Sequence, residues 1–391
     1  MIPFEKAFEI VMNSSFRTGT EIVPFTRSLN RILAADVTSD INMPPFNKAS
    51  VDGFACRKSD LSNDLEIIET IPAGKWPEKE VDKNQCTRIM TGAAVPEGAD
   101  CVIMVEDTET LPSGKVRFTG TSTKENIAHK AEDIEKNDVV IKAGKQINPQ
   151  DIAVMATVGH TSVTVSKIPE IAVISTGDEL VEPHMTPGIS QIRNSNAYQL
   201  IAQAERAGAV AKYYGIARDD KEETYSIISR AIDENDLVLI TGGVSMGDFD
   251  FVPSVLERAG VKILFTRVAV QPGKPTTFGV HRKAIVFGLP GNPVSSFVQF
   301  ELLVRPLINN MMGYTWKPVT LSFPMREKYS RKSADRMGLI PVSITDDGFV
   351  RRVEFHGSAH ISALPDATGM VIIPHGVDSI EKGEIVNVRL I

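Results

Sequence analysis

The sequence has few of the residues that build disulfide scaffolds, zinc sites or membrane spans. Its 391 residues include only three cysteines, Cys56, Cys86 and Cys101, and no CxxC pair, so free thiols in a reducing compartment are expected. The seven histidines are scattered without HExxH or another metal-ligand spacing, which argues against a zinc site. No run of about 18 apolar residues occurs, and the start, MIPFEKAFEIVMNSS, carries acids among its apolar residues like an amphipathic helix. We therefore expect no signal peptide, no membrane partner and a cytoplasmic location.

A basic excess is absent as well. The chain has 42 Lys and Arg against 49 Asp and Glu, a net charge of −7. Nucleic-acid binding needs a basic face that displaces counterions, so no nucleic-acid partner is expected. The glycine-rich run TGGVSMGD also lacks the lysine of an ATP-binding P-loop. An anionic ligand is therefore expected to be held by backbone N–H groups, by a few cations or by a bound metal.

The length and the changes in pattern predict an α/β protein of several domains. Between 169 and 316, apolar β-branched segments alternate with helical segments, which is typical of a parallel sheet covered by helices on both faces. Residues 45–135 are short strand-like pieces punctuated by Pro and Gly, which predicts a small inserted β domain. Segments 1–44 and 136–168 contain helical stretches that are expected to pack together as an N-terminal domain. The short apolar runs of 317–391 predict a C-terminal β barrel or sandwich.

Small and polar residues follow each expected strand of the 169–316 segment. Ligands of an open parallel sheet bind outside the carboxyl ends of its strands, so these residues are expected to form one site. In chain order they are Thr176, Gly177, Asp178, Glu179, Asp219, Asp220, Gly242, Gly243, Ser245, Gly247, Asp248, Asp250, Lys274, Gly291, Asn292 and Ser295. The glycines let backbone N–H groups approach an oxyanion, and Ser295 lies near the start of a helix. Clustered carboxylates repel a phosphate, so a Mg²⁺ ion is expected between them, and its candidate ligands are Asp219, Asp220, Asp248 and Asp250.

Each of these motifs also has a purely local interpretation. Asp248, or one of Asp219 and Asp220, is equally well explained as the N-cap of a helix. LPGNP is typical of a β-turn with proline at a helix start, and Lys274 of a solvated turn. The functional hypothesis therefore depends on the coincidence of these positions at one sheet edge.

Several longer segments are specific enough to be compared with known families. In chain order they are PPFNKASVDGFA, TRIMTGAAVPEGADCVIMVED, AVISTGDELVEP, ITGGVSMGDFDFV, VAVQPGKPTTFG, GLPGNPVSSFVQFELLVRP and GSAHISALPDATGMVIIP. Together they resemble the molybdopterin molybdenumtransferase, or MoeA, family, which includes the C-terminal domain of gephyrin. The resemblance runs from the first helix to the last strand. It implies a MogA-like molybdopterin-binding α/β domain and a Mg²⁺-dependent enzyme that inserts molybdate into adenylylated molybdopterin, releases AMP and delivers molybdenum cofactor.

The resemblance also implies roles for individual residues and for partners. The catalytic positions of the family match Asp52, Thr91, Asp133, Glu179, Lys274 and Ser362, and its metal-binding acids match Asp219 and Asp250. The implied cofactor-binding set is Thr176, Gly177, Asp178, Gly242, Gly243, Ser245, Pro290, Gly291, Asn292, Pro293 and Ser295. Family members are elongated homodimers whose cleft is made by both subunits. Molybdopterin-synthesis proteins and acceptor molybdoenzymes are the implied partners.

Two departures from the family pattern affect the expected anion site. Gln271 in QPGKP stands where many members have lysine. In NIAHKAEDI, Ala128 replaces a common arginine and Ala131 a common glycine; His129 or Lys130 is a candidate for the missing positive charge, and a solvated surface position is the alternative. The competing functions are a non-catalytic scaffold of the same fold and an enzyme that adenylylates molybdopterin, for which the additional terminal domains are not required.

Overall fold

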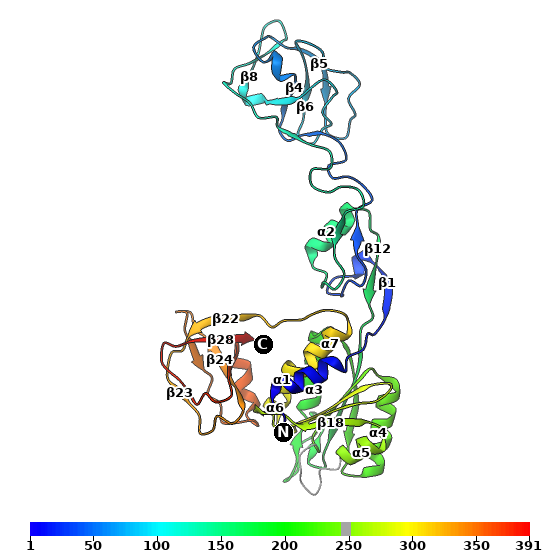
Figure 1. Ribbon diagram of the computed structural model, residues 1–391, viewed down its shortest axis with the longest axis vertical. Coiled ribbons are helices and arrows are strands. Elements are labelled where there is room, and N and C mark those ends of the chain that lie inside the picture. The colour runs from blue at the N-terminus through cyan, green and yellow to red at the C-terminus, as the bar shows by residue number, and fades with distance from the viewer. Residues whose placement is uncertain (244–251) are drawn as a thin grey trace.

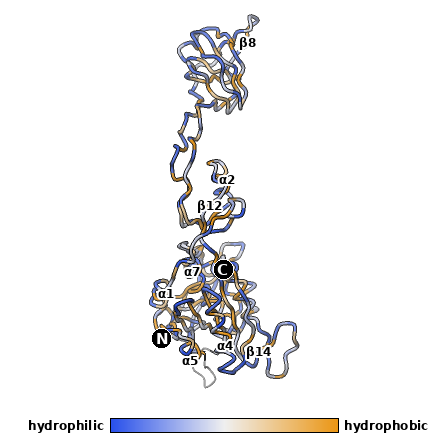
Figure 2. Tube along the Cα trace, turned by 90° about the vertical axis from the view of Figure 1, so that its right-hand side faces the viewer, coloured by the Kyte–Doolittle hydropathy of each residue, from blue (hydrophilic) through white to orange (hydrophobic). Residues whose placement is uncertain are grey.

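The chain folds into an elongated molecule with four units along its length. The computed structural model describes residues 1–243 and 252–391. Figure 1 shows a far unit, residues 48–128, at one end, and a slender middle unit formed by residues 20–38 and 139–166. At the other end a sheet unit, residues 170–311, lies beside a C-terminal unit, residues 320–390. The view turned by 90° shows the same separation of the far unit from the rest (Figure 2).

The sheet unit is built on a mixed sheet of six strands. In spatial order they are β16 (Val210–Ala217), β13 (Glu170–Thr176), β17 (Leu237–Thr241), β21 (Ile285–Leu289), β20 (Pro275–Val280) and β18 (Lys262–Arg267). The first four pair in parallel, whereas β20 is antiparallel to both β21 and β18. The sequence pattern predicts a parallel sheet, and the antiparallel β20 corrects this prediction. A strand that begins with proline and contains glycine carries a weak sequence pattern.

Helices cover both faces of this sheet, which explains why its central strands are mainly apolar and buried. Along β13, Ile171 and Val173 are buried in one core, and Ala172 and Ile174 are buried in the other. Full burial of a valine or isoleucine side chain contributes about 1.5–3 kcal/mol. The first face is covered by α1 (Phe4–Asn13), α3 (Asn196–Arg206), α6 (Pro293–Gln299), the π-helical turn η4 (Phe300–Val304) and α7 (Arg305–Met311). The second face is covered by α4 (Lys221–Glu234) and α5 (Val252–Arg258).

The middle unit joins two segments that are far apart in the sequence. Its strand pairs are β1 (Thr20–Pro24) with β12 (Ser162–Ser166) and β2 (Val37–Thr38) with β11 (Val139–Ile141), and α2 (Pro149–Thr157) packs with them. Its core contains Leu33, Met155 and Val165. Helix α1, by contrast, packs against α7 and η4 of the sheet unit. The domain boundaries expected from the sequence stay a prediction.

The far unit contains a four-stranded sheet with short accessory pairs. The sheet order is β5 (Glu66–Ile71), β6 (Gln85–Ile89), β4 (Gly53–Cys56) and β7 (Cys101–Met104). The accessory pairs are β8 (Thr108–Thr110) with β9 (Val116–Phe118) and β3 (Lys48–Ala49) with β10 (Ile127–Ala128). The three cysteines are buried here as free thiols, and Sγ of Cys56 lies 3.7 Å from Sγ of Cys101.

The C-terminal unit is an open sheet. Its order is β19 (Val270–Gln271), β24 (Met337–Ile344), β26 (Gly369–Ile373), β28 (Ile385–Leu390) and β22 (Thr320–Pro324), with β25 (Val350–Arg352) on β24 and a separate pair of β23 (Tyr329–Ser330) with β27 (Ser379–Ile380). Within the described residues β22 does not pair with β19, so no closed barrel is found. The open end is physically reasonable, because β19 is a two-residue strand supplied by a loop of the sheet unit. No helix in the described ranges is long and apolar enough to cross a membrane.

Candidate functional site

The strand order of the sheet unit creates a crevice at one edge. From β13 the chain passes through α3 to β16 on one side, and then through α4 on the opposite face to β17 on the other side of β13. The connections from β13 and β16 therefore leave on opposite faces of the sheet. In open α/β sheets this reversal of strand order opens a ligand crevice outside the carboxyl ends of the strands.

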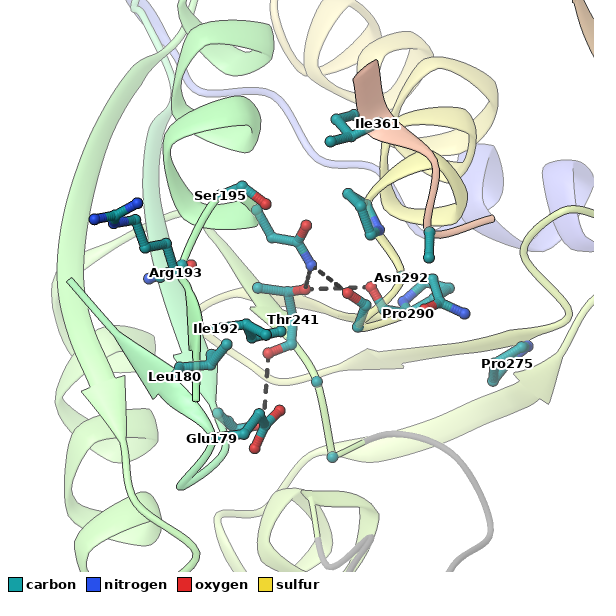
Figure 3. A pocket seen from close by; sticks show the side chains of 18 residues that line it. Glu179, Leu180, Ile192, Arg193, Ser195, Thr241, Pro275, Pro290, Asn292 and Ile361 are labelled. Atoms are coloured by element: carbon teal, nitrogen blue, oxygen red, sulfur yellow. Dashed lines mark hydrogen bonds between the residues drawn. The ribbon is translucent and has the colours of Figure 1, made fainter. Parts of the chain in front are cut away.

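A cleft of about 690 Å³ occupies this position. Loops that follow β13, β17 and β21 line it, together with Pro275 at the start of β20 (Figure 3). The structure thus brings together Thr176, Glu179, Gly242, Gly243, Pro290, Gly291, Asn292 and Pro293 from the sequence-predicted set. Gly177 and Asp178 lie in the turn between Thr176 and Glu179. The expected site residue Ser245, with Asp248 and Asp250, lies outside the described residues.

Glycine is required after β17 because the backbone passes against Thr176. Gly242 has φ of 92°, and a Cβ on it would lie 2.5 Å from the Thr176 carbonyl oxygen. A Cβ on Gly243, whose φ is 61°, would lie 2.9 Å from Thr176 Oγ1 and 2.8 Å from a methyl of Val252. Any side chain here would clash, so the two glycines keep the end of β17 close to the end of β13.

A buried asparagine fixes the ends of β17 and β21 to each other. Asn196, at the start of α3, donates from Nδ2 to Thr241 Oγ1 at 2.8 Å and to the Gly291 carbonyl at 2.7 Å (Figure 3). Thr241 in turn donates to the Pro290 carbonyl at 3.2 Å. Sequence reasoning missed both Asn196 and Thr241. The available signal was the run NSN before α3, which holds more polar side chains than one helix cap uses.

A second network orders the segment that carries Glu179. Ser175 donates to Asn194 at 3.0 Å, Asn194 donates to the hydroxyl of Tyr213 at 2.8 Å, and Tyr213 donates to Glu182 at 2.7 Å. Burial and the hydrogen bond to Glu182 raise the pKa of Tyr213, so its hydroxyl remains a proton donor. The network holds β14 (Leu180–Val181) and β15 (Ile192–Arg193), the parallel pair beside the cleft.

A cationic pocket of about 610 Å³ adjoins the cleft between the sheet unit and the C-terminal unit. It shares Pro275, Pro290 and Asn292 with the cleft. Its basic lining residues are Lys274, Arg331, Arg336, Arg352 and His356, and the buried Ser295 and the exposed Gln271 also line it. The arginines were missed, because they come from the C-terminal unit and no strand-end pattern marks them.

The roles of these cations differ. Arg331 donates to the carbonyl oxygens of Val377, Arg336 and Pro374, which makes it a structural residue. Lys274 is exposed at the rim, where an anion can reach it. Ser362 lies in a neighbouring pocket of about 820 Å³ that shares Arg352 with the cationic pocket.

The strand-end acids divide into two kinds. Asp220 accepts from the backbone N–H groups of Glu222 at 3.0 Å and Glu223 at 2.8 Å, so it caps α4, as the local interpretation predicts for one of the pair. Oδ1 of Asp220 is therefore used by the helix cap, and its role as a metal ligand stays a prediction. The Asp178 carboxylate instead accepts from the backbone N–H of Asp219 at 3.3 Å, which brings these two exposed acids together. Within the described ranges no group of three His, Cys, Asp or Glu side chains is arranged to hold a metal.

The remaining predicted residues lie far from the cleft of their own chain. Asp52 accepts at Oδ1 from the backbone N–H of Thr91 at 2.6 Å and from its hydroxyl at 2.7 Å, and these bonds lower the pKa of the Asp52 carboxyl. Asp133 lies where the chain leaves the far unit, and its N–H donates to the Met43 carbonyl at 3.0 Å. Figures 1 and 2 both separate the far unit from the sheet unit. One chain therefore does not bring Asp52, Thr91 and Asp133 to the cleft.

The structure also shows the residues near Asp133 that differ from the family pattern. His129 contacts Glu125 at 3.1 Å, so its ring is engaged on the surface of the far unit. Ala131 has φ of 66°, in the left-handed region that favours glycine. The alanine is held there by the bond from its N–H to the Pro44 carbonyl at 2.9 Å.

Comparison with known proteins covers the whole chain. Residues 2–159 match the "MoeA N-terminal region (domain I and II)", 172–310 the "Probable molybdopterin binding domain" and 325–391 the "MoeA C-terminal region (domain IV)". A Staphylococcus epidermidis protein named molybdopterin molybdenumtransferase is 36% identical, with 100% of this chain and 95% of the relative covered. The Bacillus subtilis protein of the same name is 34% identical, over 100% of this chain and 94% of its own length.

Solved structures give the same result. A crystal structure of a molybdopterin biosynthesis MoeA protein from Pyrococcus horikoshii superposes with a TM-score of 0.87 at 28% identity, over 100% of both chains. Another crystal structure, of a molybdopterin biosynthesis MoeA protein from Pyrococcus horikosii, has a TM-score of 0.85 at 34% identity, over 100% of this chain and 99% of the other. The three family regions, the full-length relatives and the superposed structures all identify the same family, and the chain belongs to it: the MoeA family.

Proposed function

We propose that this chain inserts molybdate into adenylylated molybdopterin and releases AMP, giving molybdenum cofactor. The observation that carries the proposal is the continuity of the switch-point cleft with the cationic pocket, which share Pro275, Pro290 and Asn292. A nucleotide-like substrate and a small oxyanion need two adjacent subsites of this kind. The names of the full-length relatives point to the same reaction.

The chemistry of the two subsites fits this division. The N–H of Gly242 donates to the Leu289 carbonyl at 3.2 Å, whereas the N–H of Gly243 has no partner within the described residues and is the one that can face a phosphate. The continuous helix that begins at Pro293 directs its positive end toward the cleft. Lys274 and Arg352 in the second pocket supply positive charge for a tetrahedral dianion. Preorganised donors of this kind stabilise negative charge that develops as the phosphoanhydride opens.

The residues present fit a Mg²⁺ ion. Asp178 and Asp219 are exposed, adjacent and free of ion pairs within the described residues, and Mg²⁺ typically takes one or two carboxylates plus substrate oxygens. Asp219, with Asp250 by resemblance, would hold the ion, and Asp178 orients the Asp219 backbone. The ion would offset charge on the substrate phosphates.

A homodimer completes the proposal. Asp52, Thr91 and Asp133 match family site positions, yet they lie at the far end of the chain from the cleft (Figure 1). A second copy that sets its far unit against the cleft would supply them. Transfer of the product to acceptor molybdoenzymes follows from the same family resemblance.

Two alternatives are less well supported. An enzyme that only adenylylates molybdopterin does not require the N-terminal and C-terminal regions, which are both present here. A non-catalytic scaffold has no need to keep Glu179, Asp178 and Asp219 at one strand edge.

Single-turnover AMP release tests the proposal. Purified protein is mixed with adenylylated molybdopterin and Mg²⁺, with molybdate, tungstate or no oxyanion in parallel. We expect oxyanion-dependent release by the wild-type protein and a loss of about 100-fold or more in Asp219→Ala. The matched control is Asp220→Ser, which removes the neighbouring carboxylate but keeps a helix cap, and should release AMP normally. Substrate binding without release by the wild-type protein would favour the scaffold, and equal activity of both variants would refute the metal site.

A further inference from the structure

At one end of the far-unit sheet, large side chains are exposed instead of packing in the core of the unit. Ile71, Ile89, Gly53 and Met104 are opposite one another at this end of β5, β6, β4 and β7. The loop 72–76 therefore leaves from the same edge as Thr91, Asp52 and Val105. The segments 42–47 and 130–136 lead to the middle unit and pair with each other, since Asn47 accepts from Lys130 and Met43 from Ile134. They lie at this end too, because Asn47 also accepts from the N–H of Val95, shortly after Thr91.

Trp76 is exposed in this position, although it is one of only two tryptophans in the chain. Its residue surface is 66% accessible. One side of the ring is fixed, because Phe46 packs perpendicular to it with the ring centroids 5.6 Å apart. An aromatic pair of this geometry contributes about 0.5–1.5 kcal/mol beyond burial of its area, so the tryptophan is oriented while most of its surface stays available.

The loop that carries Trp76 is held in place. The N–H of Lys75 donates to the Pro72 carbonyl at 3.2 Å, closing a turn, and Pro77 follows the tryptophan. The Glu69 carboxylate accepts from the backbone of Glu78 at 3.1 Å and contacts the Lys75 ammonium at 3.4 Å. A fixed loop presents a large side chain at little further entropic cost, which is the arrangement expected of a binding residue.

The neighbouring strand ends supply one polar group between two apolar ones. Asp52 Oδ1 is occupied by both bonds from Thr91, while Oδ2 has no hydrogen-bond partner within the described part of the chain. On the far side of Asp52, Met104 and Val105 are 36% and 43% exposed. The edge therefore offers an aromatic ring, an ionised carboxylate oxygen and an apolar border in that order.

We propose that Trp76 is a stacking platform for the flat heterocycle of the substrate, with Asp52 Oδ2 accepting from the exocyclic amino group of the ring. The purine and the aminopyrimidinone part of the pterin in adenylylated molybdopterin are flat and carry such an amino group, so the recognised chemistry is common to them. The proposal rests on the proposed function, because the far unit reaches the cleft only of a second copy. It adds a specificity residue to that shared site.

Tryptophan emission distinguishes the two rings. In Trp316→Phe, Trp76 is the sole tryptophan, and the replaced ring lies against the guanidinium groups of Arg305 and Arg389, away from the far unit. The full-length protein is titrated separately with AMP and with pterin-6-carboxylate. Saturable quenching by one of them identifies the ring that stacks. If neither compound quenches the emission, the proposal is overturned. It is also overturned if the emission shifts with protein concentration and not with ligand concentration, and that result would assign Trp76 to a subunit contact.

Kinetics provide a second readout that does not need the Trp316 variant to fold. Stacking on an aromatic side chain is worth enough that Trp76→Ala should raise KM for adenylylated molybdopterin about tenfold, with kcat little changed. Trp76→Phe keeps a smaller ring and should recover most of the loss. If the wild-type protein releases AMP and Trp76→Ala has an unchanged KM, the stacking role is refuted while the proposed function stands. If the wild-type protein releases no AMP, the proposed function is refuted, and the fluorescence titration still tests whether Trp76 stacks on a heterocycle.

Discussion

Removal of the Asn196 side-chain amide tests how the cleft is held together. The amide joins Thr241, at the end of β17, to Gly291, after β21, through bonds of 2.8 and 2.7 Å. Asn196→Ala leaves both acceptors without this donor while the start of α3 and the surrounding core stay intact. The variant therefore separates the clamp from the rest of the fold.

The structure sets the size of the expected effect. Thr241 is 2% exposed, so its hydroxyl oxygen loses a donor where water does not easily replace it, at a cost of about 1–3 kcal/mol. Gly291 is exposed to the cleft, so water can replace the lost donor to its carbonyl, and this bond adds little to the loss of stability. Asn196 Oδ1 is itself buried without a partner in the described structure, and its removal offsets part of the loss. We expect a net destabilisation of about 1–2 kcal/mol, and a melting temperature of the sheet unit lower by about 2–6 °C.

The effect on activity should exceed the effect on stability. A shift of about 1 Å in a positioning loop can lower the rate by about 100-fold, so kcat/KM for AMP release should fall about 10- to 100-fold. The matched control is Gln199→Ala, in the same helix, which removes one bond of 3.2 Å to the Pro293 carbonyl and does not join β17 to β21. Thermal unfolding and AMP release are measured for both variants. Equal losses of activity in the two would refute the clamp.

Two further predictions concern stability and thiol chemistry. Glu301 accepts from Gln203 at 2.9 Å and contacts Arg206 at 2.7 Å and Arg305 at 2.9 Å, so Glu301→Gln should destabilise the sheet unit by about 3–5 kcal/mol in urea unfolding. Burial opposes ionisation of Glu301, but Gln203 and the two arginines outweigh this effect and lower the pKa of the carboxyl. The stability difference between wild type and Glu301→Gln should therefore persist above the ordinary carboxyl pKa and vanish as the pH falls through the depressed value. A stability difference that grows on acidification would contradict this. The three far-unit thiols are buried, and burial raises the pKa of Cys86 to about 12, so a thiol reagent at neutral pH should label none of them in the folded protein and all of them in urea; rapid labelling of the native protein would show that the core opens.

Periodicity and composition predicted the strands of the sheet unit because both faces of that sheet are buried. β13, β17 and β21 follow from continuous apolar runs, and the convergence of their loops follows from the parallel arrangement. β20 was missed because it is antiparallel and begins at a proline. The open end of the C-terminal sheet was not predictable either, since β19 comes from a different unit.

The site was predictable where chemistry lies at strand ends and not where it depends on tertiary contact. Glycines and acids after strands are local signals, whereas the cationic pocket needs Arg336 and Arg352 to fold back from another unit. Asp219 and Asp220 are neighbours in sequence, and only the hydrogen bonds show that Asp220 is used as a helix cap. Asn196 acts through buried bonds to two other segments, and no single-sequence pattern records them.

The separation between the far unit and the cleft has a genetic consequence. If each site combines the far unit of one chain with the cleft of another, a chain damaged at Asp52 still contributes a sound cleft, and a chain damaged at Asp219 still contributes a sound far unit. Two such inactive alleles expressed together would restore about a quarter of the sites, because half of randomly assembled dimers are mixed and each mixed dimer has one intact site. Alleles damaged at the same end would never rescue each other. In such a dimer the elongated shape would divide loss-of-function mutations in this chain into two complementation groups.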